Sequence, residues 1–200
     1  MDAGPVDQLA CNRYFDPTFG AEAVKVLPGE YFVTTTDMLL VTALGSCVSA
    51  CIRDTVRGIG GMNHFMLAES GEHSPFSASA RYGAYAMEVL INHLYKLGAR
   101  HECLEAKVFG GGRVMEALAH SHVGDHNARF VLDFLQTEEI PVAAQDLLDV
   151  YPRKVYFFPV SGRVLVKKLM RMHNDTLMRR EKEYAARLTT TPVSGDIELF

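Results

Sequence analysis

Two neighbouring stretches of the chain decide how it is interpreted. Residues 39–54 read LLVTALGSCVSACIRD, and residues 58–67 read GIGGMNHFML. The first holds two apolar runs with a small-residue break directly before Cys47, and the second is an apolar run that delivers His64. Short β-rich runs bounded by turn signals are typical of strands. This pattern therefore predicts a sheet organised around one cysteine and one histidine.

We expect residues 48–53 and 58–65 to pair as an antiparallel hairpin about a short turn at residues 55–56. In that register Cys47 faces His64 directly. Opposed residues have Cβ atoms roughly 4.5–5.5 Å apart, so a thiol and an imidazole come within reach of a hydrogen bond. A cysteine beside a histidine is the pattern of an activated nucleophile with its base.

Other interpretations stay open at this stage. A free cysteine is often a buried small hydrophobe, and a slip of one residue in register would send His64 to the other face of the sheet. The run after Cys47 would also suit a helix. Its N-terminus would then lower the thiol pKa by another route.

The pattern of the whole chain predicts an α+β fold: a single domain of mixed, mostly antiparallel β-sheets flanked by two or three helices. Helices are expected near Ser77–Leu97, at Asn127–Gln136 and at Asn174–Leu188, because their apolar residues recur at helical spacing. Further strands are expected at Tyr31–Thr35 and Leu39–Ala43 (a hairpin), Glu105–Phe109, Ile140–Ala144, and Lys154–Pro159 with Arg163–Lys168 (a second hairpin).

Three segments are expected along the chain: an irregular N-terminal leader at 1–28, the main domain at 29–170, and a C-terminal helix and tail at 171–200. The 200 residues are 48% hydrophobic, which suits one domain with a sizeable core. The formal charge of −4 gives no support to a nucleic-acid binder. No apolar run approaches the ~18 residues of a membrane span, and four cysteines without framework spacing indicate reduced thiols in the cytosol.

Two further motifs have a chemical and a structural interpretation. Gly110-Gly111-Gly112 follows a predicted strand, but it lacks the Gly-Lys-Ser/Thr ending of a phosphate-binding loop. A sharp turn or a backbone packed close to the active site is therefore favoured. The histidines at 120, 122 and 126 would suit zinc. No matching Cys or Glu lies nearby, so a metal site is not favoured.

At this point the chain resembles a known family, the chemoreceptor glutamine deamidases of bacterial chemotaxis (the CheD family). The resemblance covers roughly residues 31–168 and is carried by several motifs in order. They are Leu44-Gly45-Ser46-Cys47-Val48, Gly60-Gly61-Met62-Asn63-His64-Phe65-Met66-Leu67, Arg81-Tyr82-Gly83 with Ala86-Met87, Lys107-Val108-Phe109-Gly110-Gly111-Gly112, Val123-Gly124 with Asn127, and Arg153-Lys154-Val155. One local departure is Tyr151-Pro152, where the family pattern has a glycine-rich pair.

The resemblance implies a cytoplasmic enzyme that hydrolyses glutamine side-chain amides on methyl-accepting chemotaxis receptors. Cys47 would attack the amide with His64 as base, through a γ-glutamyl thioester, and no step requires a cofactor. The family is associated with a threonine upstream of the cysteine, and Thr42 is the match here. Ser46 and Asn63 are competing candidates for this supporting role, and backbone N–H groups around Ser46-Cys47 are candidates for the oxyanion site.

A second class of function is a non-catalytic module that docks a chemotaxis phosphatase or a receptor, with Cys47 structural. Relatives in the family bind such a phosphatase, so docking and catalysis are compatible. A third class is a zinc hydrolase built on the histidine group at 120, 122 and 126.

Overall fold

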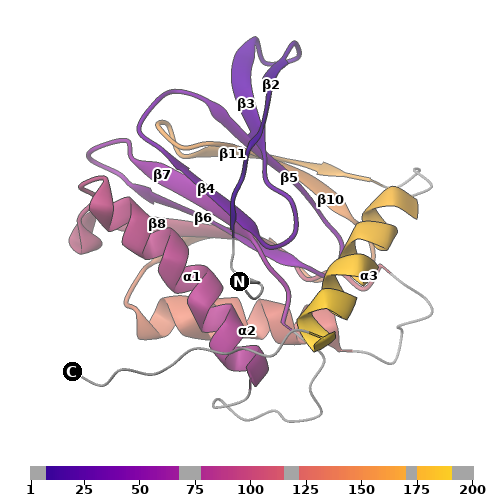
Figure 1. Cartoon of the computed structure of the whole chain (residues 1–200). Coiled ribbons are helices and arrows are strands. Elements are labelled where there is room, and N and C mark those ends of the chain that lie inside the picture. Colours follow the sequence, from indigo (N-terminus) through magenta and orange to yellow (C-terminus); the bar gives the residue numbers. More distant parts are fainter. Residues whose placement is uncertain (1–7, 68–77, 115–121, 170–174, 191–200) are drawn as a thin grey trace, which may run out of the picture.

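The computed structural model describes residues 8–67, 78–114, 122–169 and 175–190. It has two mixed β-sheets and three α-helices (Figure 1), which confirms the predicted α+β class. Among these residues, no helix is both long enough and apolar enough to cross a membrane. The chain between residues 67 and 78, the histidine at 120 and the tail after residue 190 lie outside the described residues.

One sheet has six strands in the order β1-β4-β7-β6-β8-β9. Its strands are β1 (Gln8–Leu9), β4 (Glu30–Thr34), β7 (Gly60–His64), β6 (Val48–Asp54), β8 (Leu104–Gly110) and β9 (Val142–Leu147). The pairs β1–β4 and β8–β9 are parallel, and the other neighbours are antiparallel.

The second sheet has five strands in the order β11-β10-β5-β3-β2. Its strands are β11 (Arg163–Lys168), β10 (Arg153–Phe158), β5 (Leu39–Leu44), β3 (Ala21–Lys25) and β2 (Asn12–Asp16). Here only β3 and β5 run parallel. The predicted hairpin of β10 and β11 is confirmed.

The helices are α1 (Ala78–Lys96), α2 (Val123–Thr137) and α3 (Asp175–Thr190), with a short 3₁₀ turn η1 (His101–Cys103) before β8. α1 and α2 pack on the six-stranded sheet, and α3 stands at one end of the two sheets (Figure 1). One buried apolar cluster joins α1 and α2 to both sheets, including Leu40 and Phe157 of the five-stranded sheet.

Side-chain alternation in two strands explains where the site forms. In β5, Leu40, Thr42 and Leu44 alternate with Leu39 and Val41, which belong to a separate cluster on the other face of the sheet. In β7, the side chain of Asn63 bonds to α1 at the Ala86 carbonyl, whereas that of His64 bonds to β5. The space between the sheets is therefore where residues of both can meet.

The predicted hairpin of Tyr31–Thr35 with Leu39–Ala43 is wrong. β4 pairs with β1 and β7, whereas β5 pairs with β3 and β10, so the chain changes sheet between them. The side chain of Thr34 accepts a hydrogen bond from the Thr36 N–H at 3.1 Å. This local turn redirects the chain instead of closing a hairpin.

The N-terminal region also differs from the irregular segment expected at 1–28, because residues 8–25 contain β1, β2 and β3. β2 and β3 form a hairpin at the edge of the five-stranded sheet (Figure 1). Their buried positions are few, which explains why the hydrophobic pattern gave a weak signal.

The register of the β6–β7 hairpin is two residues away from the predicted one. Cys51 pairs with Met62, not with Gly60, and Asp54 closes onto Ile59. The Asp54 carboxylate accepts hydrogen bonds from the N–H groups of Val56 and Arg57, at 2.9 and 2.8 Å. This side-chain bonding holds a four-residue loop in place of the short turn that we predicted. A two-residue shift keeps every side chain on its face, so His64 still lies on the face expected for it.

Candidate active site

Cys47 lies in the loop at residues 45–47, where the chain crosses from β5 in one sheet to β6 in the other. All three loop carbonyls accept hydrogen bonds from outside the loop. The Gly112 N–H donates to Gly45, the Asn127 side-chain amide donates to Ser46, and the Gly111 N–H donates to Cys47, at 2.7, 2.8 and 2.8 Å. With the carbonyls held, the loop is fixed and its three N–H groups point to the other side.

The glycine run that begins at the last residue of β8 therefore has the structural role that we predicted for it, as backbone packed against this loop. Gly110 has φ +110, and a Cβ there would lie 2.1 Å from the Cys47 carbonyl oxygen. Only glycine fits this close approach. A larger residue would push the cysteine loop away from β8.

His64 is held by Thr42 across the gap between the sheets. The two side chains are 2.8 Å apart, from Thr42 Oγ1 to His64 Nδ1, and both residues are buried. Thr42 Oγ1 also donates to the Val26 carbonyl at 2.7 Å. A hydroxyl has a single proton, so Thr42 must accept from the ring, and His64 carries its proton on Nδ1. The lone pair is then on Nε2, which is buried without a hydrogen-bond partner among the described residues.

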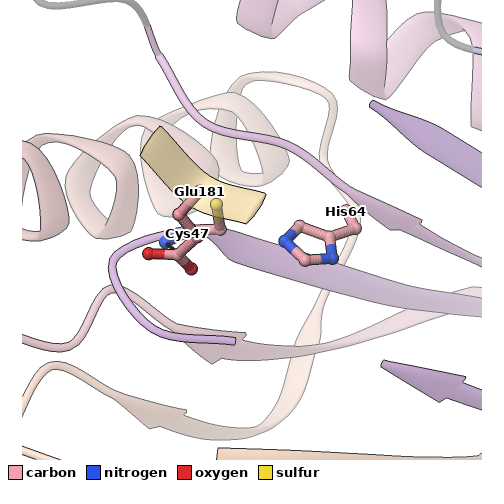
Figure 2. Close-up of side chains that lie close together, drawn as sticks. All are labelled: Cys47, His64 and Glu181. Atoms are coloured by element: carbon pink, nitrogen blue, oxygen red, sulfur yellow. Dashed lines mark hydrogen bonds between the residues drawn. The ribbon is translucent and has the colours of Figure 1, made fainter. Parts of the chain in front are cut away.

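A third residue, Glu181 of α3, completes the group. A sulfur of Cys47, a ring nitrogen of His64 and a carboxylate oxygen of Glu181 all lie within 4.8 Å of one another. Figure 2 shows the three side chains gathered in one place, with the turn of α3 that carries Glu181 beside the cysteine loop. All three residues are buried.

The Glu181 carboxylate accepts the hydrogen bonds that the cysteine loop offers. Its Oε1 accepts from the N–H groups of Gly45 and Cys47, at 2.7 and 3.3 Å. Its Oε2 accepts from the N–H and the hydroxyl of Ser46, at 3.0 and 2.8 Å. Thiolate, imidazole and carboxylate are also metal ligands, but donors that converge on one point favour an anion there. The loop is therefore an anion-binding site beside the thiol.

The electrostatics of this closed arrangement favour a neutral pair. Burial, together with the charge and the hydrogen bond of Glu181, raises the pKa of the Cys47 thiol well above its ordinary value. Burial lowers the pKa of His64 to about 4. Cys47 is thus a thiol and His64 a neutral imidazole when Glu181 is in place.

Comparison with known proteins shows which family the chain resembles. The model of the CheD family, described as CheD chemotactic sensory transduction, matches residues 66–168. A protein of Dechloromonas aromatica, named probable chemoreceptor glutamine deamidase CheD 1, is 66% identical over 97% of this chain and 96% of its own length. Proteins named probable chemoreceptor glutamine deamidase CheD, from Methylobacillus flagellatus and Thiobacillus denitrificans, are 60% and 59% identical, over 99% and 100% of this chain and the whole of each relative. The chain belongs to the CheD family.

The other site candidates in this CheD family member lie in different environments. Ser46 contributes its N–H and its hydroxyl to the anion site. Asn63 points away from His64: its oxygen accepts from the Ala50 N–H at 2.9 Å, and its nitrogen donates to the Ala86 carbonyl at 3.2 Å. These contacts tie β7 to β6 and α1 and give Asn63 a structural environment.

Two residues near the site were not singled out for it from the sequence. Asn127 was noted only as part of a family motif, yet it is fully buried and joins the loop at Ser46 to the Leu67 N–H. Glu181 was missed altogether. It falls among the inward positions of the C-terminal helix, between Met178 and Tyr184, so a charged residue within an apolar stripe was the available signal.

Of the histidine group considered for zinc, His122 and His126 are described. Their rings lie 6.3 Å apart at the start of α2, and His122 approaches Asp125 at 3.4 Å.

Proposed function

We propose that this chain hydrolyses glutamine side-chain amides to glutamate on the cytoplasmic part of chemotaxis receptors, with Cys47 as nucleophile. The observation that carries the proposal is the orientation of His64. Its Nδ1–H donates to Thr42, which leaves the Nε2 lone pair free on the side of the thiol. The names of the relatives, chemoreceptor glutamine deamidases, supply the substrate class.

The residues support each step of the chemistry. Nε2 of His64 takes the thiol proton as the Cys47 sulfur attacks the carboxamide carbon. The tetrahedral oxyanion is stabilised by the N–H groups of the cysteine loop, which already bind a carboxylate in this structure. His64 returns the proton to the departing ammonia, and a γ-glutamyl thioester remains.

Water then hydrolyses the thioester. Neutral His64 accepts a proton from the attacking water, and the products are glutamate and the free thiol. Thr42 holds the same ring tautomer through both halves of the reaction. In this proposal Thr42 positions the base and Ser46 belongs to the oxyanion site.

The direct test is mass spectrometry of a chemoreceptor cytoplasmic fragment after incubation with the protein. Conversion of amide to acid adds about 1 Da to each modified peptide, as expected for hydrolysis through a thioester. We expect Cys47→Ala to abolish the gain. Cys103→Ala, which changes a thiol outside the site, is the matched control and should retain it.

Conversion that persists in Cys47→Ala would contradict the nucleophile assignment. A fragment that binds without any gain in mass would favour the alternative, a binding module of the chemotaxis pathway. A phosphatase as docking partner is carried over from the family resemblance alone, and co-purification with a chemotaxis phosphatase would test it.

A further inference from the structure

The anion site beside Cys47 is occupied by the chain's own C-terminal helix. Three backbone N–H groups and one hydroxyl of residues 45–47 donate to the two oxygens of Glu181. The carboxylate fills the space beside the loop, because a Cβ at Gly45 would lie only 2.7 Å from Glu181 Oε2. Glu181 is 1% exposed although it lies on a highly charged helix.

The rest of α3 is attached lightly. Of its side chains from 176 to 188, Glu181 and Tyr184 are buried, and the others are exposed or half-buried. Tyr184 packs against Gly29, where a Cβ would come within 2.7 Å of the ring, and its hydroxyl bonds to that of Tyr82. Glu181 and Tyr184, one helical turn apart, are thus the two buried anchors of the helix, and Ala185 and Leu188 pack against the core with only part of their surface buried.

The group that occupies the anion site, a glutamate side chain, has the chemical structure of the reaction product. A glutamate side chain is the product of glutamine hydrolysis, and here it lies against the thiol, the imidazole and the oxyanion donors. We propose that α3 is an internal product mimic: Glu181 fills the seat of the substrate side chain and Tyr184 anchors the helix, so that α3 must leave before a glutamine can enter. This inference rests on the proposed function for the identity of the seat.

The closed state has the properties of a blocked enzyme. Cys47 is buried, and the charge of Glu181 raises the thiol pKa, which disfavours the thiolate that attacks the substrate. Displacing Glu181 would remove this charge and open the loop N–H groups to a new carbonyl. A substrate glutamine with an aromatic or apolar neighbour one helical turn away would compete with Glu181 and Tyr184 for the two positions that they occupy.

The test measures how fast iodoacetamide alkylates Cys47 in the full-length protein, followed by peptide mapping. Glu181→Ala removes the carboxylate, and Tyr184→Ala removes the second anchor without touching any charge of the site. We expect each change to speed alkylation by about tenfold or more, the factor that one unit of thiol pKa alone would give. Glu183→Ala is the matched control, because Glu183 is an exposed glutamate of the same helix paired with Arg179.

Cys51 provides an internal gauge of folding, because it is buried in β6 outside the site. Faster alkylation at Cys47 while Cys51 stays protected supports release of α3. An equal increase in the alkylation rate of both thiols in a variant means unfolding. In that case the conservative change Tyr184→Leu replaces Tyr184→Ala and is read in the same way.

The outcomes separate the two proposals. Faster alkylation of Cys47 in Glu181→Ala but not in Tyr184→Ala would mean a local charge effect, and would overturn the inference that the two side chains anchor the helix over the site. Unchanged alkylation in both variants would overturn the inference that α3 is a product mimic. If α3 competes with substrate, both variants should also lower the KM for the receptor fragment with little change in kcat. Faster alkylation without any receptor deamidation would leave the product-mimic inference standing and contradict the proposed function.

Discussion

The hydroxyl of Thr42 lies 2.8 Å from Nδ1 of His64 and donates its own hydrogen bond to the Val26 carbonyl. The strand β5 of one sheet thereby sets the tautomer of a base on β7 of the other. The relation depends on both sheets keeping their separation, so the protonation state of the site is coupled to the packing of the fold.

Replacing Thr42 by Val tests this relation, because it removes the hydroxyl and keeps the β-branched shape. We expect the rate of glutamine deamidation to fall about 10- to 100-fold, equivalent to about 1.4–2.8 kcal/mol for a lost buried hydrogen bond that orients the base. Thr55→Val, in the exposed turn after β6, is the control. A Thr42→Val enzyme at wild-type rates, with Ser46→Ala inactive, would instead assign the orienting role to Ser46.

The sequence was sufficient to predict Cys47, His64 and Thr42 as residues of one site, for different reasons. The cysteine and histidine followed from strand patterns, whereas Thr42 followed from family resemblance. The predicted register was two residues off, because the carboxylate of Asp54 binds two N–H groups of its turn and lengthens the loop. The predicted direct opposition of Cys47 and His64 is therefore wrong, because Val48 pairs with Phe65. The two-residue shift kept His64 on its predicted face, and the two side chains still lie within 4.8 Å of each other.

The sequence could not place Glu181 in the same way. Five charged residues occupy positions 179–183, and although Glu181 falls within the apolar stripe of the helix and Glu183 does not, no local pattern indicates what the Glu181 carboxylate contacts. The difference arises from tertiary structure: one turn of α3 lies over three N–H groups that belong to a loop more than 130 positions earlier. Likewise, no strand pattern indicates that β4 and β5 join different sheets.

Asn127 should act on the shape of the cysteine loop, because it is the side chain that holds the Ser46 carbonyl. We expect Asn127→Ala to destabilise the protein by about 1–3 kcal/mol, the cost of leaving buried polar groups unpaired. It should also reduce deamidation more than an equally destabilising change elsewhere. Asn63→Ala is the matched comparison, since its contacts lead to β6 and α1 and not to the loop.

Denaturant unfolding of both asparagine variants, combined with single-turnover deamidation by the folded fraction, would check this. Equal activity per folded molecule in the two variants would remove Asn127 from the positioning of the nucleophile.

The lowered pKa of His64 makes a prediction for stability against pH. The ring has a pKa of about 4 in the folded protein against an ordinary value of 6.5, so between these values the unfolded chain binds a proton that the folded chain does not. Stability therefore falls as pH drops through this window, by at most about 1.4 kcal/mol per pH unit from this one group.

The measurement is the unfolding free energy of the wild type and of His64→Gln between pH 4 and pH 7. We expect the difference between the two proteins to change with pH inside the window and to be flat above it. Parallel curves throughout would mean that the buried imidazole is not held neutral by the fold.

The last prediction uses the chain as its own substrate. Glu181→Gln places a carboxamide where the carboxylate now lies, within the group formed with Cys47 and His64. If the amide oxygen takes the N–H donors of the loop and the amide nitrogen turns towards His64, the sulfur can attack the carboxamide carbon. Ammonia leaves as the thioester with Cys47 forms, water then hydrolyses this thioester to the acid and the free thiol, and the wild-type residue is restored. We expect the peptide with residue 181 to gain about 1 Da, because a docked side chain makes the step intramolecular.

Three observations would distinguish this reaction from spontaneous loss of ammonia. The gain should be absent in the double variant Cys47→Ala with Glu181→Gln, absent at position 183 in Glu183→Gln, and independent of protein concentration. Because a carboxylate uses both pairs of donors and an amide uses only one, the amide should also dock less tightly, and Cys47 should be alkylated faster before conversion than after it. An amide at position 181 that persists, in an enzyme that converts receptor glutamines over the same period, would mean that the seat of Glu181 is not the seat of the substrate.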